Sequence, residues 1–245
     1  MKVLFISSEC LPFAKTGGLG DVVGVLPKVL NEKGIDVRVI IPLYKDINNK
    51  NIQMKELADG LHVMLGPVKE YFSVKETTIG NNIKIYFIDN KKYFDRQGIY
   101  GSSAGAYSDN AERFIFFSRA VIEAVKAINF QPDIMHAHDW HTALVPAYLK
   151  TVYKSDNFFY RTSSVFTIHN MAHQGICPSY IMPFTGISWE EFNMSKMEYY
   201  GNINILKAGI VYSDIITSVS KSYNKEIQHS KELGRGLEGV LAGRA

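Results

Sequence analysis

The residues with the clearest chemistry form the run Lys-Thr-Gly-Gly-Leu-Gly-Asp at positions 15–21. Residues 2–7 predict a buried strand and the apolar spacing from Asp21 onward predicts a helix, so the run occupies a strand-to-helix turn. Glycines let a ligand approach the backbone, the free N–H groups at a helix start attract a phosphate or a sugar oxygen, and Lys15 adds a positive charge. The spacing matches neither a dinucleotide-binding fingerprint nor a P-loop. The alternative is a tight turn in which Asp21 caps the helix.

A second cluster, His-Ala-His-Asp-Trp-His at 136–141, lies where a predicted parallel strand ends and a helix begins. Ligands of open α/β sheets bind at such carboxyl ends. Three histidines and an aspartate could also hold zinc, but no glutamate or cysteine follows at ligand spacing, so we expect no metal. The alternatives for individual side chains are hydrogen-bonded core histidines at His136 and His138 and a helix cap at Asp139.

A third cluster, His-Asn-Met-Ala-His-Gln-Gly at 169–175, follows the predicted strand Val-Phe-Thr-Ile at 165–168. The carboxyl ends of parallel strands meet at one edge of a sheet, so this cluster should open at the same edge as the other two. Taken alone, a histidine after a strand is more often structural than functional.

Strand-like apolar runs alternate with helical stretches along the chain, which predicts an α/β domain with a mainly parallel sheet. Residues 71–79 and 83–89 flank the turn Gly80-Asn81-Asn82 and predict an antiparallel hairpin added to that sheet. Residues 90–107 predict a long polar loop, of a length that is usually functional or mobile. The other expected strands are 36–41, 133–138, 164–169 and 214–219, and the expected helices are 111–128, 142–153, 203–212 and one from 221.

The composition of the 245 residues is that of a globular protein, with 46% apolar and 21% charged residues. The formal net charge of +3 comes without a basic run longer than a pair, so we expect neither nucleic acid nor a membrane as partner. The N-terminal apolar run is short and meets Glu9, unlike a signal peptide, and no segment is long enough to span a bilayer. Cys10 and Cys177 are too few for a disulfide framework and predict free thiols in the cytoplasm.

The three clusters resemble motifs of bacterial glycogen synthases and plant starch synthases. The Lys-Thr-Gly-Gly-Leu-Gly-Asp run behind Val-Leu-Phe-Ile-Ser at 3–7 is similar to the opening of these enzymes, while Asp-Trp-His at 139–141 and His-Asn at 169–170 match two later motifs. Segments 93–100, 107–114, 206–209 and 236–240 extend the resemblance over essentially the whole chain. Gln97 stands where proline is common, and His173 where the family has tyrosine. Three matched motifs at one sheet edge favour a functional interpretation.

The resemblance implies a Rossmann-like, mainly parallel sheet with helices on both faces, as in the N-terminal domain of a two-domain (GT-B) glycosyltransferase. Residues 1–245 would form the acceptor-side domain, with the nucleotide-binding C-terminal domain absent from this chain. The complete enzyme would be a retaining glucosyltransferase that transfers glucose from ADP-glucose to the non-reducing end of an α-1,4-glucan or maltooligosaccharide, without a cofactor. The isolated chain would have little or no activity. The alternatives are a glucan-binding module without activity and a transferase for another nucleotide sugar.

The same resemblance implies roles for single residues. Lys15 would contact the donor's distal phosphate, Asp139 would lie in the catalytic cleft on the acceptor side, and His169 would reach the donor glucose near its 6-hydroxyl. Tyr100 matches an aromatic residue of the acceptor region, with packing of its loop as the alternative. If the ring at His173 shapes the glucan path, its departure from tyrosine could alter acceptor preference. The expected substrate-binding residues are Gly17, Gly18, Asp21, Tyr100, Asn170 and Gln174.

Overall fold

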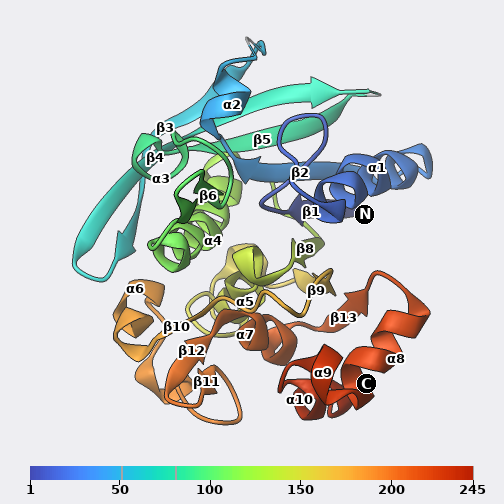
Figure 1. Ribbon diagram of the computed structural model, residues 1–245. Coiled ribbons are helices and arrows are strands. Elements are labelled where there is room, and N and C mark those ends of the chain that lie inside the picture. Colours follow the sequence, from blue (N-terminus) through green and yellow to red (C-terminus); the bar gives the residue numbers. More distant parts are fainter. Residues whose placement is uncertain (51, 81, 245) are drawn as a thin grey trace.

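The computed structural model describes residues 1–50, 52–80 and 82–244. An eight-stranded sheet runs through the molecule in the order β13-β9-β8-β1-β2-β5-β4-β3 (Figure 1). The six strands from β13 to β5 are parallel to one another, and β4 and β3 continue the sheet in antiparallel pairing. The expected α/β class with a mainly parallel sheet is confirmed. The strands are β1 (Lys2–Ile6), β2 (Asp36–Pro42), β3 (Lys55–Leu65), β4 (Val68–Ile79), β5 (Ile83–Asp89), β8 (Ile134–His138), β9 (Ser163–Ile168) and β13 (Ile215–Ser218).

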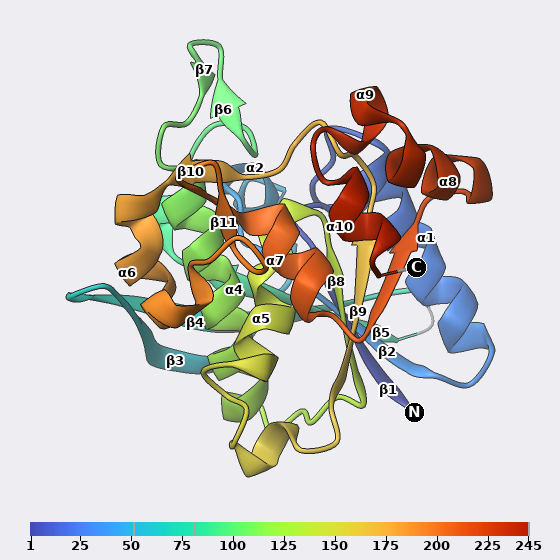
Figure 2. The same cartoon turned by 90° about the horizontal axis from the view of Figure 1, so that it is seen from below.

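Helices cover both faces of the sheet, as Figure 2 shows. Helices α4 (Asn110–Ala127) and α5 (Leu144–Lys150) lie on one side and α1 (Gly18–Glu32) lies on the other. Helix α7 (Ile205–Tyr212) packs against α5. In the described part of the chain, no helix has the length and apolar character needed to span a bilayer. The remaining elements are α2 (Lys45–Asn48), α3 (Lys91–Phe94), α6 (Met182–Thr185), α8 (Lys221–His229), α9 (Lys231–Gly234), α10 (Glu238–Ala242), β6 (Gly101–Ser102), β7 (Gly105–Ala106), β10 (Ile176–Pro178), β11 (Glu198–Tyr199) and β12 (Asn202–Asn204).

The central strands are apolar on both faces because helices exclude water from each side. Residues 4–6 of β1 and 39–41 of β2 are completely buried, and α4 adds Phe114, Phe116 and Phe117 to the same core. This packing holds the strands rigidly. Side chains that follow their carboxyl ends therefore have well-defined positions at one edge of the sheet.

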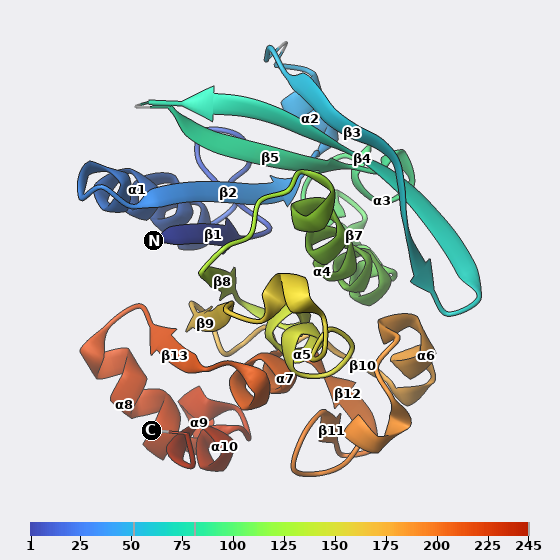
Figure 3. The ribbon, with the colours of Figure 1, turned by 180° about the vertical axis from the view of Figure 1, so that it is seen from behind.

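The hairpin expected around Gly80 is confirmed, since β4 and β5 pair antiparallel up to Ile79 and Ile83. Gly80 and Asn82 both have positive φ, as tight hairpin turns require, and Asn81 lies outside the described residues. The sequence does not predict β3, because its residues do not alternate regularly between buried and exposed and bulges interrupt its pairing with β4. This strand forms the outer edge of the sheet beside α4 (Figure 3).

Three departures from the sequence prediction bear on the candidate site. Helix α1 begins at Gly18 with Gly17 as its N-cap, so Asp21 lies in the first turn and does not cap the helix. The helix expected at 142–153 is a 3-10 turn, Trp140–Thr142, followed by α5. The loop expected at 90–107 contains α3 and the small β6–β7 hairpin, because the Asn90 side chain caps α3 by accepting a hydrogen bond from the N–H of Tyr93.

Candidate active site

The buried carboxylate of Glu9 holds the glycine-containing turn in place through hydrogen bonds. It is only 3% exposed and lies just after β1. The N–H and hydroxyl of Thr16 each donate to it at 2.7 Å, and the N–H of Gly17 donates at 3.1 Å. Sequence reasoning missed this role, although a carboxylate placed directly after a buried strand was a usable signal.

The first glycines of α1 face open space. A Cβ atom added at Gly17 or Gly18 would meet no other atom within 4 Å, and neither residue has positive φ. By contrast, a Cβ at Gly24 in the same helix would lie 2.7 Å from Cβ of Leu11. Packing therefore requires glycine at 24, whereas at 17 and 18 the absent side chains leave the backbone accessible to a ligand. The N–H groups of the first helical residues have no intrahelical acceptor and point the same way.

Lys15 lies beside this helix start and is paired with Asp21. Its Nζ is 2.7 Å from Oδ1 of Asp21, and the two side chains are 40% and 48% exposed. An exposed ion pair of this kind is worth at most about 1 kcal/mol. The ammonium group is therefore free to exchange Asp21 for a stronger anion.

The carboxylate of Asp139 at the sheet edge has a strongly shifted pKa. The residue follows β8 with φ of 55° and ψ of 179°, a strained backbone conformation that residues other than glycine rarely adopt. Its Oδ1 accepts hydrogen bonds from the N–H groups of His169, at 2.7 Å, and Asn170, at 3.3 Å. Its side chain makes no capping hydrogen bond to the turn Trp140–Thr142, so the helix-cap interpretation is wrong. Burial raises the pKa of Asp139 to about 7, although the two N–H groups favour its charged form.

His136 and His138 of the second cluster form hydrogen bonds at the sheet edge, as expected. Nε2 of His136 lies 2.6 Å from Oγ1 of Thr167, and Nδ1 of His138 lies 3.0 Å from Nε2 of His169. Burial lowers the pKa of His136 and of His169 to about 4, and that of His138 well below its ordinary value. These rings are therefore neutral at pH 7. Across the described ranges, no three His, Cys, Asp or Glu side chains converge as metal ligands.

A cavity of about 710 Å³, which we call the first cavity, opens at the carboxyl ends of β1, β8 and β9. It brings together six of the expected site residues: Gly17, Gly18, Tyr100, Asp139, His169 and Asn170. Lys15 and Asp21 do not line it, but each adjoins a lining residue in the chain, Thr16 and Val22 respectively, and we call this border the rim. Its described lining contains the carboxylates of Glu9 and Asp139 but no lysine or arginine.

Tyr100 connects the 90–107 segment to the glycine turn. Its hydroxyl donates to Oε1 of Glu9 at 2.7 Å and lies 2.7 Å from Oγ of Ser8. Its ring stacks on that of His141, with the centroids 4.6 Å apart. Burial is the main cause that raises the pKa of Tyr100, so the hydroxyl stays protonated as a hydrogen-bond donor.

A second cavity, of about 580 Å³, adjoins the first and shares Asn110, Trp140 and His173 with it. Gln174 lines this second cavity rather than the first. Its buried amide donates to the carbonyls of Met171 and Arg235 and accepts from Asn204, so it is held by the protein itself. A substrate contact by Gln174 stays a prediction.

Comparison with known proteins finds matches over nearly the whole chain. A family model described as the starch synthase catalytic domain matches residues 2–243. The chain is 47% identical to a glycogen synthase of Elusimicrobium minutum and 45% identical to one of Koribacter versatilis, in each case over all of this chain and 50% of the relative. It is also similar to the catalytic domain of starch synthase IV from Arabidopsis thaliana, solved with ADP and acarbose. That match has a TM-score of 0.87 at 29% identity and covers 99% of this chain and 49% of the other.

Proposed function

This chain belongs to the family of starch synthase catalytic domains, and from that premise we propose that it is the acceptor-side half of a retaining glucosyltransferase. The complete enzyme would transfer glucose from ADP-glucose to the non-reducing end of an α-1,4-glucan or maltooligosaccharide. The chain spans about half the length of the curated relatives it matches. We therefore assign the nucleotide pocket to a second domain.

The observation that carries this proposal is the chemistry of the first cavity. Carboxylate, imidazole and amide groups line it, and two glycines leave backbone open without a packing or φ requirement. Such a lining suits a neutral ligand rich in hydroxyl groups. It does not suit a diphosphate, since Lys15 stands at the rim and the described lining holds no lysine or arginine. The sugar would therefore enter the cavity, with the diphosphate at the rim against Lys15 and the start of α1.

In the proposed reaction the bond between glucose C1 and the β-phosphate oxygen breaks. The 4-hydroxyl oxygen of the glucan forms its bond to C1 from the same face, and the hydroxyl proton passes to the departing phosphate oxygen. Lys15 would stabilise the negative charge that grows on that oxygen, and the Asp139 carboxylate would stabilise the positive charge on the sugar. Closure of a second domain over the cavity would exclude the water that otherwise hydrolyses the donor.

We place this activity in the cytoplasm, a reducing compartment. Cys10 and Cys177 are both free and buried. Burial raises the pKa of each thiol to about 12, which keeps both protonated and unreactive. Two such thiols fit a compartment that does not form disulfides.

The proposal is tested by measuring ADP release in a protein that joins this chain to its second domain. With maltotriose as acceptor, ADP-glucose should be consumed and a longer glucan formed with retained α configuration. Retention of maltotriose without ADP release would instead identify a glucan-binding module. Faster turnover of UDP-glucose or GDP-glucose would assign a different donor.

A further inference from the structure

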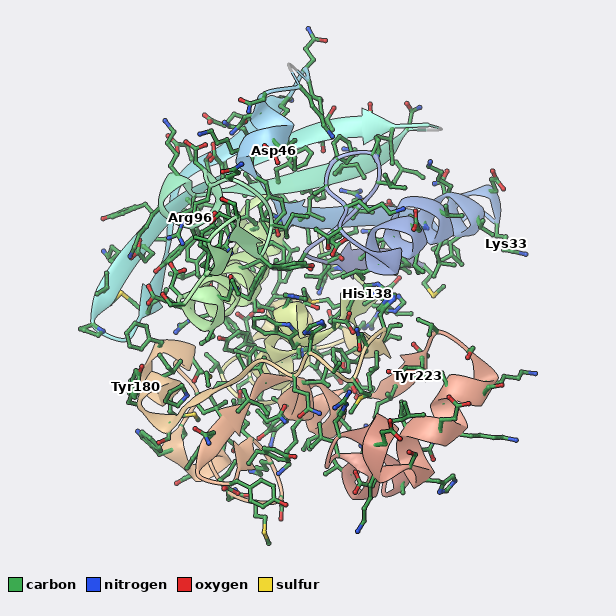
Figure 4. The ribbon with its side chains drawn as sticks, viewed as in Figure 1. Lys33, Asp46, Arg96, His138, Tyr180 and Tyr223 are labelled. Carbon is green, nitrogen blue, oxygen red and sulfur yellow. The ribbon has the colours of Figure 1, made fainter. Side chains whose placement is uncertain are left out.

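The ends of β8 and β9 hold two histidine rings in direct contact. His138, the last residue of β8, is completely buried, and Figure 4 shows it in the middle of the molecule. Its Nδ1 lies 3.0 Å from Nε2 of His169, the first residue after β9. His138 is in parallel register with Thr167, so two neighbouring strands fix this contact.

Each of these rings carries one proton at neutral pH. Burial lowers the pKa of both histidines, and a neutral imidazole has one N–H and one lone pair. The contact therefore allows two arrangements. Either His138 donates from Nδ1 to Nε2 of His169, or His169 donates from Nε2 to Nδ1 of His138.

The second nitrogen of His138 distinguishes the two arrangements. Its Nε2 is buried and makes no hydrogen bond to any described residue. If His169 were the donor, this Nε2 would carry a proton without an acceptor, and orphaned buried N–H groups are rare in proteins. If His138 is the donor, Nε2 is an unprotonated nitrogen in a ring that stacks on the apolar ring of Phe5.

We infer that His138 is a positioning residue that fixes His169 as the Nδ1–H tautomer. His169 lines the first cavity, and its Nδ1 makes no hydrogen bond to the residues that the structure describes. The group available to a ligand is therefore an N–H donor, which recognises an oxygen lone pair such as that of a sugar hydroxyl. The sugar as ligand rests on the proposed function, whereas the tautomer does not.

The tautomer is measured by ¹⁵N NMR of the chain labelled at histidine, because protonated and unprotonated ring nitrogens resonate in separate ranges. The His169 signals are assigned by their loss in His169→Gln. The expected spectrum of the unliganded chain shows the His169 proton on Nδ1. A proton on Nε2 overturns the inference, and this result needs no substitution at His138.

Two substitutions at His138 form a matched pair. His138→Asn places an amide N–H near the Nδ1 position, whereas His138→Gln places it near Nε2. The Asn variant should keep the Nδ1–H tautomer of His169 and its affinity for maltotriose. The Gln variant should lose the single tautomer and bind maltotriose about three- to tenfold more weakly, the worth of one hydrogen bond. The same single tautomer in both folded variants would contradict the inference. The expected tautomer together with no sugar binding would support it and reject the proposed function.

Discussion

At the residue scale, substitution of Lys15 distinguishes a structural ion pair from a contact with the donor phosphate. Its pair with Asp21 is exposed, so Lys15→Ala should change the free energy of unfolding by less than about 1 kcal/mol. If the ammonium instead stabilises charge on the departing phosphate, turnover by the two-domain enzyme should fall by about ten- to a thousandfold. Thermal melting and ADP release measure the two effects separately.

The matched control for Lys15 is Lys28→Ala, which removes an exposed lysine within α1 that does not line the first cavity. It should leave both stability and turnover unchanged. Lys15→Gln should not restore turnover, because it supplies no charge. If turnover in Lys15→Ala stays near that of the wild type, the glycine run has only the structural role of a turn.

The raised pKa of Asp139 predicts that stability depends on pH. Burial holds its pKa at about 7 in the folded chain, against about 4 when exposed, so only the folded chain keeps this proton between those values. The contribution of Asp139 to stability is therefore fully present below about pH 4 and is lost as the pH rises to about 7. Asp139→Asn removes the titration and keeps an oxygen that accepts from the N–H groups of His169 and Asn170.

Chemical denaturation of both proteins over this pH range measures that contribution. The unfolding free energy of the wild type, minus that of Asp139→Asn, should fall between about pH 4 and pH 7. A difference that stays constant, or rises with pH, would show that Asp139 is not held at a raised pKa. ADP release by the two-domain variant would report separately whether its charge is needed for transfer.

Residue types and spacing predicted most of the residues of the candidate site, but not the hydrogen bonds that they form with one another. Gly17, Gly18, Asp139, His169 and Asn170 line one cavity because each follows a strand that ends at the same sheet edge. The carboxylate of Glu9 was missed, since three of its four donors come from a turn whose path depends on the packing of α1 and the fourth is the distant Tyr100 hydroxyl. Pairings across strands, such as that of Asp139 with the backbone of the next strand end, depend on register, which one sequence does not encode locally.

At the element scale, two glycines of α1 should respond oppositely to the same substitution. Gly18→Ala adds a Cβ that meets nothing, so stability should stay unchanged or rise by up to about 1 kcal/mol. Gly18 lines the first cavity, so an added methyl group should narrow the space for a sugar there and the affinity for maltotriose should fall by about tenfold or more. Isothermal titration calorimetry measures the affinity, and a thermal melting curve measures the stability.

Gly24→Ala is the control on the same helix. Its Cβ would lie 2.7 Å from Cβ of Leu11, so the unfolding free energy should fall by about 1–3 kcal/mol, while affinity of the folded fraction stays near that of the wild type. If Gly18→Ala leaves maltotriose affinity unchanged, the open backbone at the start of α1 does not face the bound sugar.

The elements that were predictable share one property, a strong local pattern. Strands β1 and β2 are largely apolar runs whose residues are mostly buried, and α4 carries a long apolar face. Strand β3 has no such pattern, since it forms at the sheet edge through its pairing with β4 and its contact with α4. Helix α1 begins three residues before the predicted start because Gly17 takes an extended conformation as N-cap without needing a capping side chain.

At the scale of the whole molecule, the chain presents one wall of a proposed cleft. The described residues that line the first cavity include no lysine or arginine. The curated relatives are about twice as long as this chain. We expect this chain alone to fold and to transfer glucose at least about a thousandfold more slowly than the two-domain enzyme, a difference of about 4 kcal/mol in barrier. Purified chain and two-domain enzyme, assayed side by side for ADP release, give the comparison. Equal turnover would show that the chain is complete for catalysis.

The central claim is that the first cavity holds the sugar that is transferred. The most direct measurement is a crystal structure of the two-domain enzyme with ADP and maltotriose, which are the products of one transfer to maltose, so that the non-reducing glucose of maltotriose is the transferred sugar. We predict a glucose ring within hydrogen-bond distance of Nδ1 of His169 and of the Asp139 carboxylate, with the diphosphate at the rim against Lys15 and the first N–H groups of α1. An empty first cavity, with the sugar bound on another face of this domain, would contradict the account.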